Sequence, residues 1–180
     1  MATEYLYGTD ITHTDIINNE ANAEDLAIDG DVAQCEDMYD GGTAEYVATQ
    51  DTGIASYGSI TEIMAEIAWR ITAVPVDDDL YLEIDDGSNT WWELAAYDSV
   101  SPPPVVLGTQ QYTQTTGAVD LQTIFNTLAK IDGARIRWRG VKTKGADPGH
   151  LEVDEWRLTI TYVEYQPRPV AVGGMDPFQY

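Results

Sequence analysis

The chain of 180 residues has little cysteine, histidine or positive charge. Cys35 is its only cysteine, so no disulfide can form within the chain, and His13 and His150 are its only imidazoles. A zinc site needs several Cys or His ligands at short spacing, and a Ser-His-Asp triad needs a rigidly held imidazole. Both histidines fall in segments without a strand or helix pattern, and no glycine-rich phosphate loop is present. We therefore expect no catalytic residue and no enzymatic activity.

Long apolar runs are also missing. The longest nearly uncharged stretch, residues 100–119, contains three prolines and many polar side chains, which is not typical of a membrane span. Residues 1–15 contain no lysine, arginine or apolar run, so we expect no signal or transit peptide and synthesis in a cytoplasm.

Negative charge dominates, with 31 acidic and 9 basic side chains and a formal net charge of -22. Binding to nucleic acid or to anionic lipid needs a cationic surface, so we expect neither partner. The first 69 residues contain no cation, whereas Arg135, Arg137 and Arg139 alternate in a short basic strip. This strip could fold against the acidic N-terminal part of the same chain or meet a neighbouring copy, and the sequence leaves both interpretations open.

Alternation of apolar and polar residues predicts an all-β protein. The clearest strand is residues 60–74, and residues 80–85 and 90–95 form a hairpin around an Asp-Gly-Ser-Asn turn. Asp120 is expected to cap a single short helix. Further strands are expected at residues 45–49, 110–116, 135–139 and 156–163. The fold class that follows is an antiparallel, jelly-roll-like β-sandwich with one short helix and extended terminal arms.

Three regions are expected along the chain. Residues 1–43 form an acidic N-terminal arm and the first edge of the sandwich, residues 44–165 form the sandwich, and residues 166–180 form a proline-rich C-terminal arm. Proline limits the freedom of an unbound arm, so docking such an arm costs less entropy. The expected partner contacts are the arms and the basic strip, namely Tyr5, Leu6, Tyr7, Arg135, Arg137, Arg139, Val170, Val172, Met175, Pro177, Phe178 and Tyr180.

Adjacent tryptophans and acidic turns are the remaining candidate ligand sites. In a strand, Trp91 and Trp92 point to opposite faces, so one ring is expected in the core and the other is free to stack on a sugar or to anchor an interface. Trp69 and Trp138 are expected in the core. Glu83 or Glu93 near the two tryptophans could imitate the catalytic acid of a glycosidase. In so acidic a chain, however, some carboxylates are expected near an aromatic ring by chance. Calcium prefers oxygen ligands, and its weak candidates are Asp77, Asp79, Asp85 and Asp86, for which a solvated acidic loop is the alternative.

The order of these features resembles jelly-roll β-sandwich structural proteins of tailed-phage virions. The resemblance rests on an Asp-Gly-Asp segment before the strands, the capped helix DLQTIFNTL, the strand GARIRWRG and a closing Thr-Ile-Thr-Tyr motif at Thr159–Tyr162. It implies an outer capsid decoration protein in the virion that binds the capsid lattice through its arms. The implied partners are the major capsid protein, other virion proteins and copies of itself in a homo-oligomer. The alternatives are a carbohydrate-binding module of a tail or fibre, and a subunit of a cell-surface filament.

Overall fold

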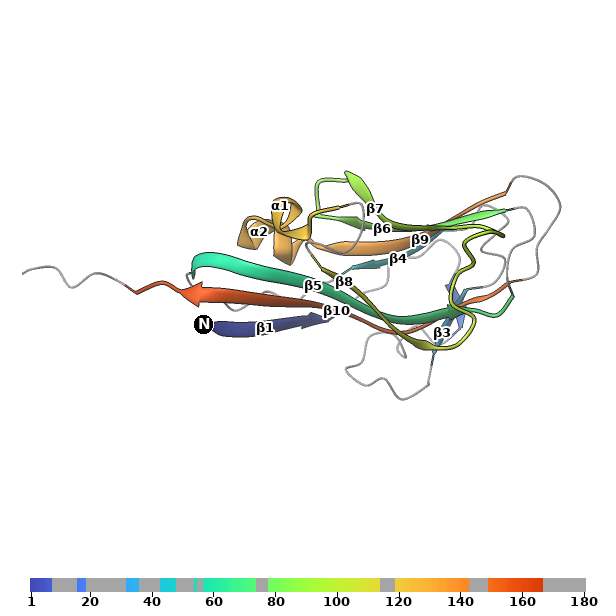
Figure 1. Cartoon of the computed structure of the whole chain (residues 1–180), viewed down its shortest axis with the longest axis horizontal. Coiled ribbons are helices and arrows are strands. Elements are labelled where there is room, and N and C mark those ends of the chain that lie inside the picture. Colours follow the sequence, from blue (N-terminus) through green and yellow to red (C-terminus); the bar gives the residue numbers. More distant parts are fainter. Residues whose placement is uncertain are drawn as a thin grey trace, which may run out of the picture.

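Alternating strands build two antiparallel sheets that pack face to face (Figure 1). The computed structural model describes residues 1–7, 16–18, 32–35, 43–47, 54, 57–73, 78–113, 119–142 and 149–166. The expected antiparallel β-sandwich is confirmed.

Sheet A has six strands and is centred on the two longest, β5 (Tyr57–Ile71) and β10 (Leu151–Glu164). Along the sheet the order is β2 (Ile16–Asn18), β3 (Ala33–Cys35), β10, β5 and β8 (Gly108–Thr113), and β1 (Ala2–Tyr7) also pairs with β10. Sheet B has four strands in the order β4 (Thr43–Val47), β9 (Arg135–Val141), β6 (Asp79–Asp85) and β7 (Trp91–Tyr97).

The core lies between the two sheets and is filled by the side chains of every second residue of each strand, which point inward. Trp69 of β5, Trp138 of β9 and Trp156 of β10 are fully buried, as expected for Trp69 and Trp138. The rings of Trp69 and Trp138 meet edge to face, with centroids 5.8 Å apart. This contact joins the two sheets through their largest apolar side chains.

Two short helices, α1 (Leu121–Ile124) and α2 (Leu128–Asp132), replace the single expected helix. The carboxylate of Asp120 accepts hydrogen bonds from the backbone of Gln122 and Thr123, as expected of an N-cap. A second cap interrupts the helix, because the Thr127 side chain accepts a bond from the backbone N–H of Lys130. In the described part of the chain, no helix is long and apolar enough to cross a membrane.

The N-terminal segment departs from the expected arm. Residues 2–7 form β1, and Leu6, opposite Leu158 of β10, is only 1% exposed. Leu6 therefore belongs to the core of its own chain and is not a contact for a partner. The prediction was wrong because Thr-Glu-Tyr-Leu-Tyr has a single inward apolar residue, which hid its strand alternation. The expected C-terminal contacts, Val170, Val172, Met175, Pro177, Phe178 and Tyr180, lie outside the described residues.

Candidate functional site

The outer face of sheet B gathers charged and aromatic side chains. Strand alternation buries Leu82 and Ile84 of β6 and directs their neighbours outward. The register of β6 with β9 then places Glu83 opposite Arg137 and Asp85 opposite Arg135. The outward residues of the two strands are Tyr81, Glu83, Asp85, Arg135, Arg137 and Arg139, and we call them, with Trp91 of β7, the sheet B face.

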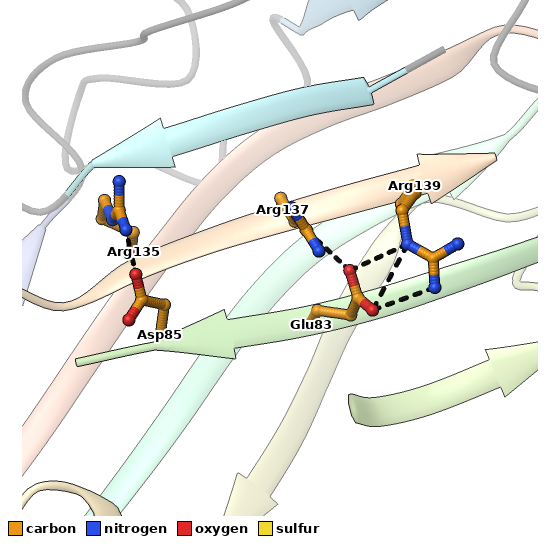
Figure 2. Close-up of polar contacts among 5 residues, drawn as sticks. All are labelled: Glu83, Asp85, Arg135, Arg137 and Arg139. Atoms are coloured by element: carbon orange, nitrogen blue, oxygen red, sulfur yellow. Dashed lines mark hydrogen bonds and ion pairs between the residues drawn. The ribbon is translucent and has the colours of Figure 1, made fainter. Parts of the chain in front are cut away.

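Glu83 is the centre of the sheet B face (Figure 2). The Nε of Arg137 donates to Oε2 of Glu83 at 2.6 Å, and the Nη2 of Arg139 donates to Oε1 at 3.0 Å. Burial by itself raises the pKa of Glu83, but the hydrogen bonds and charges of Arg139 and Arg137 outweigh it, so the net pKa lies below its usual value. Glu83 is therefore held as a carboxylate between two guanidinium groups.

A second ion pair lies one step along the strands. Asp85, which is fully buried, accepts a hydrogen bond from Arg135, and Arg135 also donates to the side-chain oxygen of Asn89 at 2.6 Å (Figure 2 shows the ion pair). The backbone N–H of Asn89 donates to Asp85 at 3.2 Å, and Asn89 has a φ of 64°. Asparagine adopts this left-handed conformation more readily than most residues, so the turn orients both groups.

Aromatic rings alternate with the arginines. The guanidinium carbons of Arg137 and Arg135 lie 4.0 Å and 5.1 Å from the ring centroid of Trp91, and that of Arg139 lies 4.4 Å from the ring of Tyr81. Cations in this position are attracted by the electron-rich face of the ring. The contacts hold the half-buried Trp91 and Tyr81 in fixed orientations on the sheet.

The two tryptophans lie on opposite faces, as strand alternation predicts. Trp92 packs against the core, while Trp91 lies on the sheet B face. Whether Trp91 stacks on a ligand stays a prediction.

The arginines do not form the unpaired basic strip that a neighbouring copy would need. Each binds an acidic side chain of its own chain, and these acids belong to β6 rather than to the acidic N-terminal part. These ion pairs are therefore intramolecular but involve β6 in place of the acidic N-terminal part, and a contact of Arg135, Arg137 and Arg139 with a partner stays a prediction. The cause of the ion pairs is the register of β6 and β9, which sets opposite charges directly across from each other.

The acidic turn at Asp85 and Asp86 binds cations of the protein itself. Asp86 binds the Nζ of Lys130 at 3.0 Å and accepts a bond from the backbone N–H of Ser88 at 3.2 Å. Within the described ranges, no group of three or more His, Cys, Asp or Glu side chains could hold a metal ion, although Asp79 and Asp85 are among them. Asp77 lies outside those ranges, and a calcium ion at Asp77, Asp79, Asp85 or Asp86 stays a prediction.

Acid catalysis is not favoured by this arrangement. Glu83 and Glu93 are opposite each other on β6 and β7, as a carboxylate pair would require. A glycosidase acid needs a raised pKa, whereas that of Glu83 is lowered.

Of the two histidines, only His150 lies among the described residues. Its backbone N–H donates a hydrogen bond to the hydroxyl of Thr72 at 2.9 Å, and His13 lies outside the described residues.

A similar cluster on sheet A was missed by the sequence analysis. Glu66 of β5 is 7% exposed although it lies on the outer face. It accepts hydrogen bonds from Arg157 of β10 and Gln111 of β8, each at 2.8 Å, and from Thr159 at 3.2 Å. Arg157 also lies 5.5 Å from the ring of Tyr5. The alternation of β5 and β10 was readable, but the cross-strand register that joins these residues was not.

Comparison with known proteins supplies no family. No protein-family model matches the chain, and no curated protein matches its sequence. Among solved structures it is similar to the xylan-binding module CBM15, with 13% sequence identity and a TM-score of 0.38, over 87% of this chain and 99% of that one. A likeness this distant carries no information about the ligand of this chain.

Proposed function

We propose that this protein is a non-catalytic module that binds a carbohydrate on the sheet B face. The observation that carries the proposal is the pairing of Arg137 and Arg139 with one carboxylate, Glu83, beside the rings of Trp91 and Tyr81. Sugars offer hydroxyl groups that donate and accept hydrogen bonds and C–H faces that pack on aromatic rings. A rigid sheet with charged hydrogen-bonding groups and oriented rings matches both features.

The hydrogen-bonding capacity of the face is not used up by its ion pairs. A guanidinium group has five N–H donors, and Arg137 contacts Glu83 through its Nε, at a side-chain exposure of 20%. Arg139 uses its Nε and Nη2 and is 34% exposed. The remaining donors of both arginines are suited to ligand hydroxyls, and the ion pairs keep the guanidinium planes fixed before a ligand arrives.

The charge of the whole chain narrows the ligand to neutral sugars. At -22, the protein repels a polyanion at long range, and the three arginines of the sheet B face already bind two carboxylates, Asp85 and Glu83. Sulfated or uronic-acid polymers are therefore disfavoured by the charge of the whole chain.

Binding to a glycan array of neutral and acidic oligosaccharides tests the proposal, followed by calorimetric titration of the strongest ligand. We expect neutral sugars to bind, and Trp91→Ala to weaken binding about tenfold or more because the ring supplies the stacking surface. The control is Glu62→Ala, which removes an exposed side chain of β5 on the other sheet and should leave affinity unchanged. An array without any bound glycan, or equal losses in the two variants, would contradict the proposal.

The virion assignment stays a separate prediction. Capsid decoration was expected to depend on the terminal arms, and residues 167–180 lie outside the described residues while residues 2–7 form a strand of the sandwich. The sheet B face supports the carbohydrate-binding alternative drawn from the sequence, and a place on a tail or fibre stays a prediction.

A further inference from the structure

Strand β1 is an edge strand of sheet A, because it pairs only with β10, along residues 157–162, among the described strands. It pairs with β10 over its whole length, from Ala2 opposite Tyr162 to Tyr7 opposite Arg157, without a register shift (Figure 1). Among the residues that the structure describes, no strand pairs with the other side of β1. Backbone groups of an antiparallel strand point alternately to its two sides, so about half of the N–H and C=O groups of β1 point away from the sheet.

This edge has few of the features that keep edge strands from pairing. Proline, lysine and bulges are the usual protection, and β1, with the sequence ATEYLY, contains none of them. Its single charge is Glu4. By contrast, β7 at the edge of sheet B is irregular, since its pairing with β6 skips Leu94. Of these two edges, β1 is the regular one that can accept another strand.

The surroundings of β1 carry few charges. Among residues 157–162 of β10, which pair with β1, Arg157 opposite Tyr7 is the one charged side chain. Four exposed large apolar residues lie on or next to these two strands: Met1, Tyr5, Val163 and Tyr165. Most of the charge repulsion between two copies comes from elsewhere on the molecule, and salt screens it beyond about 8 Å at physiological ionic strength.

We propose that β1 pairs with β1 of a second copy, antiparallel and around a two-fold axis, so that the two A sheets become one continuous sheet. The same strand then supplies donors and acceptors to itself, and the exposed Tyr5, near the middle of β1, lies opposite Tyr5 of the second copy. A second copy is the occupant that fits, because the strand is regular and carries one charge, Glu4, and an isologous pairing around Tyr5 keeps the two Glu4 side chains from lying opposite each other.

The two-fold axis of such a pairing is perpendicular to the joined sheet. Both B sheets therefore lie on the same side of it, and the two sheet B faces point in the same direction. This consequence rests on the proposed function, since a dimer of this shape presents two sugar-binding faces to one polysaccharide and raises the apparent affinity by avidity.

The dimer is tested without any sugar, so its outcome is independent of the proposed function. At about 100 µM protein and about 0.5 M NaCl, where repulsion is screened, we expect a dimer by sedimentation equilibrium. Hydrogen exchange should show amides of β1 becoming protected as concentration rises, while those of β8, another edge of sheet A, stay unchanged. A monomer under these conditions, amides of β1 already protected in dilute monomer, or protection confined to other strands would each overturn the proposal.

Two adjacent proline variants separate dimerisation from folding. The backbone N–H groups of adjacent strand residues point to opposite sides of the strand. Of the variants Thr3→Pro and Glu4→Pro, one therefore loses an N–H that points to β10, and the other loses an N–H that points away from sheet A. We expect the inward variant to lower the melting temperature and the outward variant to retain it while self-association weakens about tenfold or more. An outward variant that dimerises like the unmodified chain would overturn the proposal.

Discussion

At the scale of single residues, Glu83 and Glu66 have equivalent surroundings. Each lies in the middle of one sheet, and long polar side chains from neighbouring strands cover it. Burial raises the pKa of each carboxyl, but hydrogen bonds and arginine charges outweigh it, and both pKa values fall below the usual 4.5. Each carboxylate therefore stabilises the fold in its ionised form.

Glu83→Gln should destabilise the protein in a pH-dependent way. A lowered folded-state pKa stabilises the fold above the ordinary pKa of 4.5, and this contribution is lost as the pH falls through the lowered value. Near neutral pH, we expect the unfolding free energy of the variant to be about 1–3 kcal/mol lower than that of the unmodified chain. When the pH is lowered, the unfolding free energy of the variant should fall less than that of the unmodified chain. Urea unfolding at several pH values measures both effects. Glu62→Gln, at an exposed carboxylate of β5, is the control and should change stability little.

At the scale of elements, the turn between β6 and β7 touches the end of α2. Gly87 in this turn has a φ of +85°, and a Cβ there would lie 3.2 Å from the Cα and the carbonyl oxygen of Gly133. The ion pair of Lys130 with Asp86 joins the same two segments. The helices are therefore attached to the hairpin by a close backbone contact and a charge pair.

Gly87→Ala should disrupt this junction. The added methyl group meets the backbone of Gly133, and the positive φ is unfavourable for alanine, so we expect a loss of about 1–3 kcal/mol in thermal or urea unfolding. Gly58→Ala is the matched control, because its Cβ would lie at an ordinary 3.4 Å from the nearest atom, the carbonyl oxygen of Val163. Equal losses in the two variants would show that the contact with Gly133 does not matter.

At the scale of the whole molecule, the excess of negative charge opposes folding, whereas the ion pairs on the two sheets support it. Among the described residues, Arg70, Lys130, Arg135, Arg137, Arg139 and Arg157 bind carboxylates within the chain. These pairs lie partly buried on the sheets and are screened little by salt, whereas the repulsion among exposed acids is screened strongly.

Salt should therefore stabilise this protein. We expect the urea midpoint to rise as NaCl increases from about 0.02 M to about 0.5 M, because the self-repulsion of a chain at -22 weakens. At about pH 4, where carboxylates take up protons, the same change in salt should have a smaller effect. A midpoint that falls with salt at neutral pH would mean that the ion pairs outweigh the repulsion.

The sequence by itself determined the sandwich, the positions of β5, β6, β7 and β9, and the burial of Trp69 and Trp138. These features depend on alternation within one segment, which the strand period of two makes readable. Only the tertiary structure decided that Arg137 and Arg139 meet Glu83, that Leu6 enters the core and that Glu66 is covered by Arg157. Those contacts depend on which strands are neighbours and in which register, and residues 91 positions apart, such as Glu66 and Arg157, carry no local signal of their pairing.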